Sequence, residues 1–149
     1  MRSKGFTLIE ILIVMTIIAI LATILIPSIG GFDSQAKITT TTSNLNILRT
    51  QISIFRAKTG RYPETLDELA EKTYLDRGVK KKYLPKMPEE LVSSDDGGNN
   101  TTEVQLSTES LSDDGGWTYF TDTAEVVIDV STPLDKTWDE YADEKPSDW

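Results

Sequence analysis

Glu10 is the first residue of this 149-residue chain whose chemistry calls for an explanation, because it lies in the otherwise apolar segment of residues 6–29. A charge at membrane depth costs roughly 2.5 to 3.5 kcal/mol on insertion scales, so something must offset it. The alternative is that Glu10 is a chance polar residue in an ordinary membrane anchor. We therefore treat Glu10 as a candidate functional residue.

Aspartates form the second candidate set. Paired aspartates in two D-D-G-G stretches, together with acidic residues further on, could supply the oxygen ligands that Ca²⁺ prefers. No EF-hand spacing is present, and a solvated turn is the competing interpretation of each D-D-G-G stretch. The predicted calcium ligands are Asp113, Asp114, Asp122 and Asp129.

Composition limits the other functions. The chain contains no cysteine and no histidine, so disulfides are excluded and the commonest general base and metal ligand are missing. Residues 89–149 hold 17 acidic residues against two lysines, a charge of −15 within a total of −9, which argues against binding to nucleic acid. The sequence contains no nucleophile motif or phosphate-binding glycine loop, so we expect no enzyme and no catalytic cofactor.

The apolar segment continues into an amphipathic one, and together they predict one helix over about residues 6–58. Pro27 cannot donate to the helical ladder, so with Gly30 and Gly31 it predicts a kink or local melting. Gly60 should end the helix. Five apolar residues recur at helical spacing and predict a buried face: Ile38, Leu45, Leu48, Ile52 and Phe55.

The remaining residues predict a small α+β head. Residues 63–75 favour a short helix with Thr65 as N-cap and Glu68 at the capping-box position. Residues 102–108, 116–122 and 124–131 are typical of strands, which we expect to form an antiparallel sheet. The lysine run of residues 80–82 is either a solvated face or a surface for an acidic partner.

The stretch KGFTLIEILIVMTIIAILATILIP resembles the class III signal of bacterial type IV pilins and type II secretion pseudopilins. In that family a prepilin peptidase cleaves after a glycine and methylates the new amine, which implies cleavage between Gly5 and Phe6 and methylation of Phe6. Glu10 and Pro27 then become mature residues 5 and 22, as the family pattern has them. Residues 47–69 and 82–88 are similar, more weakly, to the major pseudopilin.

The resemblance implies a pilin-like fold, in which a long N-terminal helix packs on a small head. Its parts are a leader of residues 1–5, a transmembrane and filament-core helix of residues 6–29, an amphipathic half of residues 30–59, and a head of residues 60–149 with an acidic tail. It further implies that Glu10 pairs with the amine of Phe6 in a neighbouring copy, and that calcium is bound in the head, as in major pseudopilins.

The resemblance also implies a location and partners. The subunit waits in the inner membrane with its N-terminus in the cytoplasm and its head in the periplasm, and then enters a helical filament that drives protein export. Its partners are further copies of itself, prepilin peptidase, an inner-membrane assembly platform and minor pseudopilins.

Two alternatives remain open. The chain could be a type IV pilin, major or minor, although the missing cysteines count against a major type IVa pilin. It could also be an exported soluble binding protein, with Arg2 and Lys4 starting an ordinary signal peptide that is cleaved after Gly30.

Overall fold

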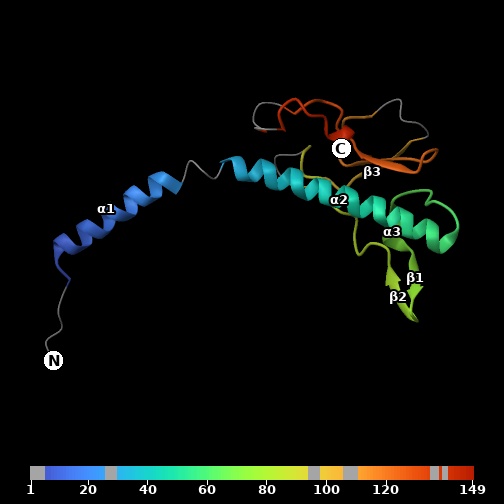
Figure 1. Ribbon diagram of the computed structural model, residues 1–149, viewed down its shortest axis with the longest axis horizontal. Coiled ribbons are helices and arrows are strands. Elements are labelled where there is room, and N and C mark those ends of the chain that lie inside the picture. The colour runs from blue at the N-terminus through green and yellow to red at the C-terminus, as the bar shows by residue number, and fades with distance from the viewer. Residues whose placement is uncertain (1–5, 26–29, 94–97, 106–110, 135–137, 139–140) are drawn as a thin grey trace.

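The computed structural model describes residues 6–25, 30–93, 98–105, 111–134, 138 and 141–149, and it confirms the α+β prediction (Figure 1). Two sheets are present among these residues, one of order β1-β2 and one of order β3-β4-β5. The elements are α1 (Leu8–Leu25), α2 (Gly30–Thr59), α3 (Asp67–Glu71), β1 (Thr73–Asp76), β2 (Val79–Lys82), β3 (Thr102–Gln105), β4 (Trp117–Phe120), β5 (Glu125–Ile128) and the short 3₁₀ helix η3 (Pro146–Asp148).

Helix α2 is the scaffold of the head. All five residues of its predicted apolar face are buried, between 0% and 4% exposed. They lie against the β4 and β5 side chains Trp117, Tyr119, Val126 and Ile128, except for Ile38, which belongs to a second cluster with Val92 and Leu134. Burying a leucine or phenylalanine contributes about 1.5–3 kcal/mol. This face therefore holds the head together.

Where the sequence predicted a single helix, the structure describes two, α1 and α2. Pro27 lies outside the described residues, and Gly30 and Gly31 form the first turn of α2. At the other end α2 ends at Thr59, and Gly60 follows with φ of 79° while its N–H donates to the Arg56 carbonyl. The predicted stop at Gly60 is confirmed.

Helix α3 is shorter than predicted and begins differently. Its N-cap is Leu66 rather than Thr65, with no side-chain cap hydrogen bond. Glu68 does not close a capping box, because its carboxylate forms ion pairs with Arg61 and Lys72, each at 3.1 Å. The prediction of Thr65 as N-cap was therefore wrong.

Strands β1 and β2 form a hairpin that we did not predict. The interpretation of residues 63–75 as one helix was wrong beyond Glu71, where Thr73 and Tyr74 begin β1. The turn consists of Arg77 and Gly78, with φ of 51° and 82°, and two positive φ angles match the right-handed twist of a two-residue hairpin. The hairpin projects from the head beside α3 (Figure 1).

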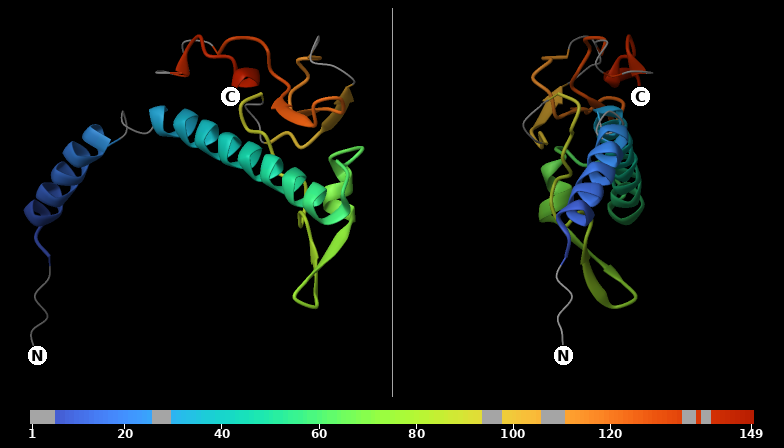
Figure 2. Two further views of the ribbon diagram at one scale, coloured as in Figure 1. Left: turned by 45° about the vertical axis from the view of Figure 1, so that its right-hand side comes forward. Right: turned by 90° about the vertical axis from the view of Figure 1, so that its left-hand side faces the viewer.

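The three-stranded sheet lies on the opposite side of α2 from the hairpin (Figure 2). β4 and β5 pair antiparallel, as predicted, but β3 runs parallel to β4, so this sheet is mixed. At the start of β4, Gly116 has φ of 86°, and a Cβ there would lie 2.5 Å from Thr101 Oγ1. Only glycine fits this close approach of two chain segments.

None of the helices, searched over the described residues, has both the length and the apolar character needed to cross a membrane. Helix α1 has 18 residues.

Candidate functional site

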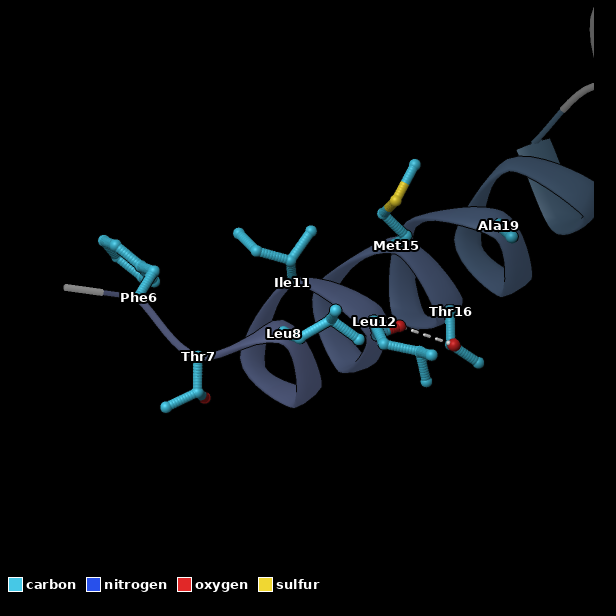
Figure 3. Close-up of a pocket in the computed structure, with 8 residues that line it drawn as sticks. All are labelled: Phe6, Thr7, Leu8, Ile11, Leu12, Met15, Thr16 and Ala19. Atoms are coloured by element: carbon cyan, nitrogen blue, oxygen red, sulfur yellow. Dashed lines mark hydrogen bonds between the residues drawn. The ribbon is translucent and has the colours of Figure 1, made fainter.

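Helix α1 is apolar around its whole circumference and extends away from the head (Figure 1). Twelve large apolar side chains from Phe6 to Leu21 are between 48% and 84% exposed. One open apolar face is lined by Phe6, Thr7, Leu8, Ile11, Leu12, Met15, Thr16 and Ala19 (Figure 3). A helix that is apolar on every side is stable only when other apolar groups cover it. This segment is therefore built to be buried by something outside the protomer.

Glu10 closes a capping box at the start of α1. Its Oε2 accepts from the N–H and the hydroxyl of Thr7, each at 3.3 Å, while Thr7 Oγ1 accepts from the Glu10 N–H at 3.3 Å. Two N–H groups that the first helical turn leaves unpaired are thus satisfied reciprocally. The sequence signal, Thr7 three residues before Glu10, was available, and our sequence analysis missed it.

The same position favours a negative charge electrostatically. Glu10 lies in the first turn of α1, where the helix dipole is positive. Phe6, the residue before the N-cap, is 79% exposed. The Glu10 carboxylate therefore lies close in the chain to Phe6, whose amine the predicted cleavage would free. Gly5, on the other side of the predicted cut, lies outside the described residues.

Two of the four predicted calcium ligands lie together, Asp113 in the turn before β4 and Asp129 directly after β5. Asp129, 1% exposed, accepts from the N–H and hydroxyl of Ser112 and from the Asp113 N–H. Asp113 accepts from the N–H and hydroxyl of Ser131. These hydrogen bonds from Ser131 lower the pKa of Asp113. Serine and backbone donors therefore already occupy both oxygens of each carboxylate.

The other two predicted ligands are exposed. Asp122 lies in the β4–β5 turn, where its carboxylate accepts from the Thr123 N–H, and Asp114 is exposed. Over the part of the chain that the structure describes, no three acidic, histidine or cysteine side chains gather closely enough to hold a metal ion. Calcium binding by these aspartates therefore stays a prediction.

Glu90 is a buried carboxylate that our sequence analysis did not single out. It is 0% exposed and accepts from the N–H groups of Val92 and Ser93, from the Ser93 hydroxyl, and from the Gly116 N–H at 3.4 Å. Its backbone also bridges to Asn99, at 2.7 and 2.6 Å. Glu90 thereby joins the connector after β2 to the start of β4. No local signal in the sequence distinguishes Glu90 from Glu89.

Arg49 is a second residue whose contacts our sequence analysis did not predict. From the polar side of α2 its guanidinium donates to the Val126 carbonyl at 3.3 Å and to the Trp149 carbonyl at 3.0 Å. It therefore ties the C-terminal segment and β5 to the helix.

Together, the long N-terminal helical segment, the small α+β head and the capped, apolar α1 define a pilin-like subunit. Residues 1–26 match the prokaryotic N-terminal methylation motif. This match, together with the relatives described next, confirms the predicted resemblance to type IV pilins and type II secretion pseudopilins.

Curated relatives from both groups match the chain. Type II secretion system core protein G of Dickeya chrysanthemi is 33% identical over 64 residues, which are 43% of this chain and 42% of that protein. Core protein G of Aeromonas hydrophila is 29% identical over 100 residues, 60% of this chain and 67% of that protein. Type IV major pilin protein PilA of Myxococcus xanthus is 40% identical over 68 residues, 46% of this chain and 31% of that protein.

The chain thus spans less than half the length of the Dickeya and Myxococcus relatives. No solved structure matches it.

Proposed function

We propose that this protein is a structural subunit of a type II secretion pseudopilus, which polymerises into a helical filament that drives protein export. The observation that carries this proposal is α1, an all-round apolar helix whose start is capped by Glu10. The methylation motif over residues 1–26 and the core protein G relatives support it. The protein acts mechanically, as a polymer subunit, and performs no catalysis.

Assembly follows from the chemistry of α1. Copies of α1 cover one another's apolar side chains in the filament core, which removes the exposure seen in the single protomer. Prepilin peptidase cuts between Gly5 and Phe6 and methylates the new amine. Glu10 then leaves Thr7 and pairs with the Phe6 amine of a neighbouring copy, which sets the axial register of the filament more than it adds stability.

Before assembly, the subunit is held in the inner membrane by its apolar N-terminal segment. Arg2 and Lys4 keep the N-terminus on the cytoplasmic side, and the head lies in the periplasm. An inner-membrane assembly platform takes up the processed subunit, and minor pseudopilins complete the filament.

A type IV pilin is the second candidate. The matches to PilA of Myxococcus xanthus and to the type IV wide pilus major component PilA4 of Thermus thermophilus, 54% identical over 45 residues, favour it. Deletion of the gene separates the two candidates. Loss of secreted proteins from the medium with surface pili retained supports the pseudopilin, and loss of pili with secretion retained supports the pilin.

Intact mass and N-terminal peptide mapping of the protein from its native host test the proposal directly. A chain that begins at methylated Phe6 supports prepilin processing. A chain that begins at Gly31 would replace both candidates with the secreted soluble binding protein.

A further inference from the structure

The β1–β2 hairpin presents an exposed leucine between two cations. The strand register puts Leu75, Lys80 and Lys82 on one face, and all three are exposed, Leu75 at 69%. On the opposite face Tyr74 packs against Tyr83, with 4.6 Å between ring centroids, so that side of the hairpin is the one turned to the head. We name Leu75, Lys80 and Lys82 the hairpin knob.

The charge of the hairpin knob is not balanced within the protomer. The ion pairs of the described residues include neither Lys80 nor Lys82. Residues 72–82 carry five basic residues and one acidic residue, a charge of +4, in a chain of net charge −9. A leucine between unpaired cations suits a partner surface that offers an apolar groove with carboxylates at its rim.

A groove of this kind lies between α2 and the C-terminal segment. It is open to solvent and has a volume of about 570 Å³. Its lining includes residues on α2 and residues around η3: Ile38, Ser43, Asn46, Tyr141, Glu144 and Trp149. Tyr141 and Trp149 are half-buried and leave apolar surface along the groove. Arg49 also borders it, but its guanidinium donates to two backbone carbonyls.

Carboxylates flank the aromatic residues of the groove. Glu144 lines the groove, and its Oε2 accepts from Trp149 Nε1 at 3.1 Å. Asp143 and Asp148, the chain neighbours of Glu144 and Trp149, are exposed. None of the three carboxylates belongs to an ion pair of the described residues, and residues 141–149 carry a charge of −2. The groove thus offers the apolar surface and the negative charge that the hairpin knob lacks.

The knob and the groove lie at different levels along α2 and on opposite sides of it. The hairpin packs at the C-terminal end, where Lys58 Nζ lies 5.6 Å from the centre of the Tyr74 ring, whereas the groove follows residues 38–49. At 1.5 Å per residue, the two are roughly 14–30 Å apart along the helix axis. The hairpin and the C-terminal segment also project from opposite sides of α2 (Figure 2). The knob and the groove can therefore meet only between copies.

We propose that the hairpin knob docks in this groove of a second copy of the chain, whose α2 runs parallel and is displaced along the axis. This inference rests on the proposed function, since it assumes that the chain polymerises. Leu75 enters the groove beside Tyr141 and Trp149. Lys80 and Lys82 pair with the carboxylates at its rim. Because the knob and the groove are different surfaces, the contact is head-to-tail, and such contacts generate an open helical filament when the rotation does not close a ring.

Cysteine cross-linking in assembled filaments tests the contact directly. Thr73 is exposed on the face of the knob without belonging to it, and Ser43 is exposed in the groove. Because the chain has no cysteine, Thr73→Cys in one tagged copy and Ser43→Cys in a second, differently tagged copy report on this contact alone. Oxidation should give a mixed dimer. The matched control is Val79→Cys with Ser43→Cys, which should give none, because Val79 is 58% exposed on the opposite face of the same hairpin.

Charge reversal in the full chain, in cells that carry the assembly machinery, tests the electrostatic part of the contact. Lys80→Glu with Lys82→Glu should reduce the yield of sheared filaments about tenfold or more, because like charges then meet at the groove. Glu144→Lys with Asp148→Lys should do the same, and the two pairs combined should restore filaments. All four side chains are exposed, so thermal unfolding of each variant should match that of the unaltered chain.

The outcomes separate the two proposals. Absence of filaments from the unaltered chain contradicts the proposed function, and this inference with it. Normal filaments from Lys80→Glu with Lys82→Glu, or filaments that give no mixed dimer through the Thr73 and Ser43 positions, overturn the docking and leave the function standing. If the hairpin variant loses filaments and the combined charge swap does not restore them, the hairpin binds another component, and docking between copies is refuted.

Discussion

Replacing Glu90 with glutamine isolates the contribution of one buried carboxylate to the stability of the head. Glutamine keeps the shape of the side chain but replaces one oxygen with a donor. In the better orientation the remaining oxygen keeps the N–H groups of Val92 and Ser93, while the new amide NH₂ faces the Ser93 hydroxyl and the Gly116 N–H. The hydroxyl can rotate to accept, but the Gly116 N–H cannot.

The magnitude follows from these contacts. The hydrogen bonds from the Val92 and Ser93 N–H groups each lose about 1 kcal/mol when their acceptor becomes neutral. The buried Gly116 N–H loses its acceptor, which costs about 1–3 kcal/mol. Relief from burying a charge offsets part of this loss, so we expect the free energy of unfolding to fall by about 2–3 kcal/mol. At about 4–8 °C per kcal/mol for a domain of this size, Tm should fall by about 8–24 °C.

The assay is thermal unfolding of the full chain in mild detergent, followed by near-ultraviolet circular dichroism, since Trp117 next to Gly116 is fully buried. Glu89→Gln is the matched control. Glu89 is adjacent and half-exposed, and its pair with Lys86 is a surface pair worth about 0–1 kcal/mol. A Tm for Glu90→Gln no lower than that of the control would refute the role assigned to this carboxylate.

Three further predictions concern the filament, the core and the metal. Glu10→Ala should leave peptidase processing intact but strongly reduce filament yield, measured by N-terminal mapping and by electron microscopy of sheared fractions; normal filaments would remove the role of Glu10 in assembly. Burial raises the pKa of Tyr119 to about 12, and its hydroxyl donates to the Pro63 carbonyl at 3.0 Å. In the unfolded chain this phenol ionises near pH 10, before it does in the folded protein. The stability contributed by Tyr119 should therefore be complete below pH 10 and decline toward pH 12. Ultraviolet titration should show one tyrosine that ionises after the others, and this last step should be absent from Tyr119→Phe. Chelation of calcium should leave the Tm of the head unchanged, because serine and backbone donors occupy Asp113 and Asp129; a Tm lowered by chelator and restored by added calcium would instead establish the predicted site.

Local patterns predicted much of the scaffold. The apolar face of α2 and its end at Gly60 follow from helical spacing and from the positive φ that glycine tolerates, and neither depends on distant parts of the chain. The antiparallel pairing of β4 and β5 was likewise predicted from a local pattern, two strand-like segments separated by a short turn. The β1–β2 hairpin was missed because the strong helix formers of α3 run directly into Thr73, and only the Arg77-Gly78 turn marks the change.

The remaining features depend on tertiary structure. Consecutive strands usually pair antiparallel, so nothing in the sequence pointed to β3 lying parallel to β4. At the N-terminal site, the family pattern predicted Phe6 and Glu10 as functional residues. The capping partner of Glu10, Thr7, could have been predicted from its spacing but was overlooked. Glu90 could not be predicted, because its burial depends on Gly116, 26 residues away.

The position of the Thr7 cap bears on how easily subunits could enter and leave a filament. The cap lies one residue beyond the predicted cut, so cleavage would leave the hydrogen bonds between Thr7 and Glu10 in place. Glu10 would then exchange neutral donors for a charged amine on assembly, and the reverse exchange on disassembly would return its carboxylate to the hydrogen bonds of Thr7. In the proposed filament this exchange would contribute little net free energy, so Glu10 would select the register in which two copies pack rather than hold them together.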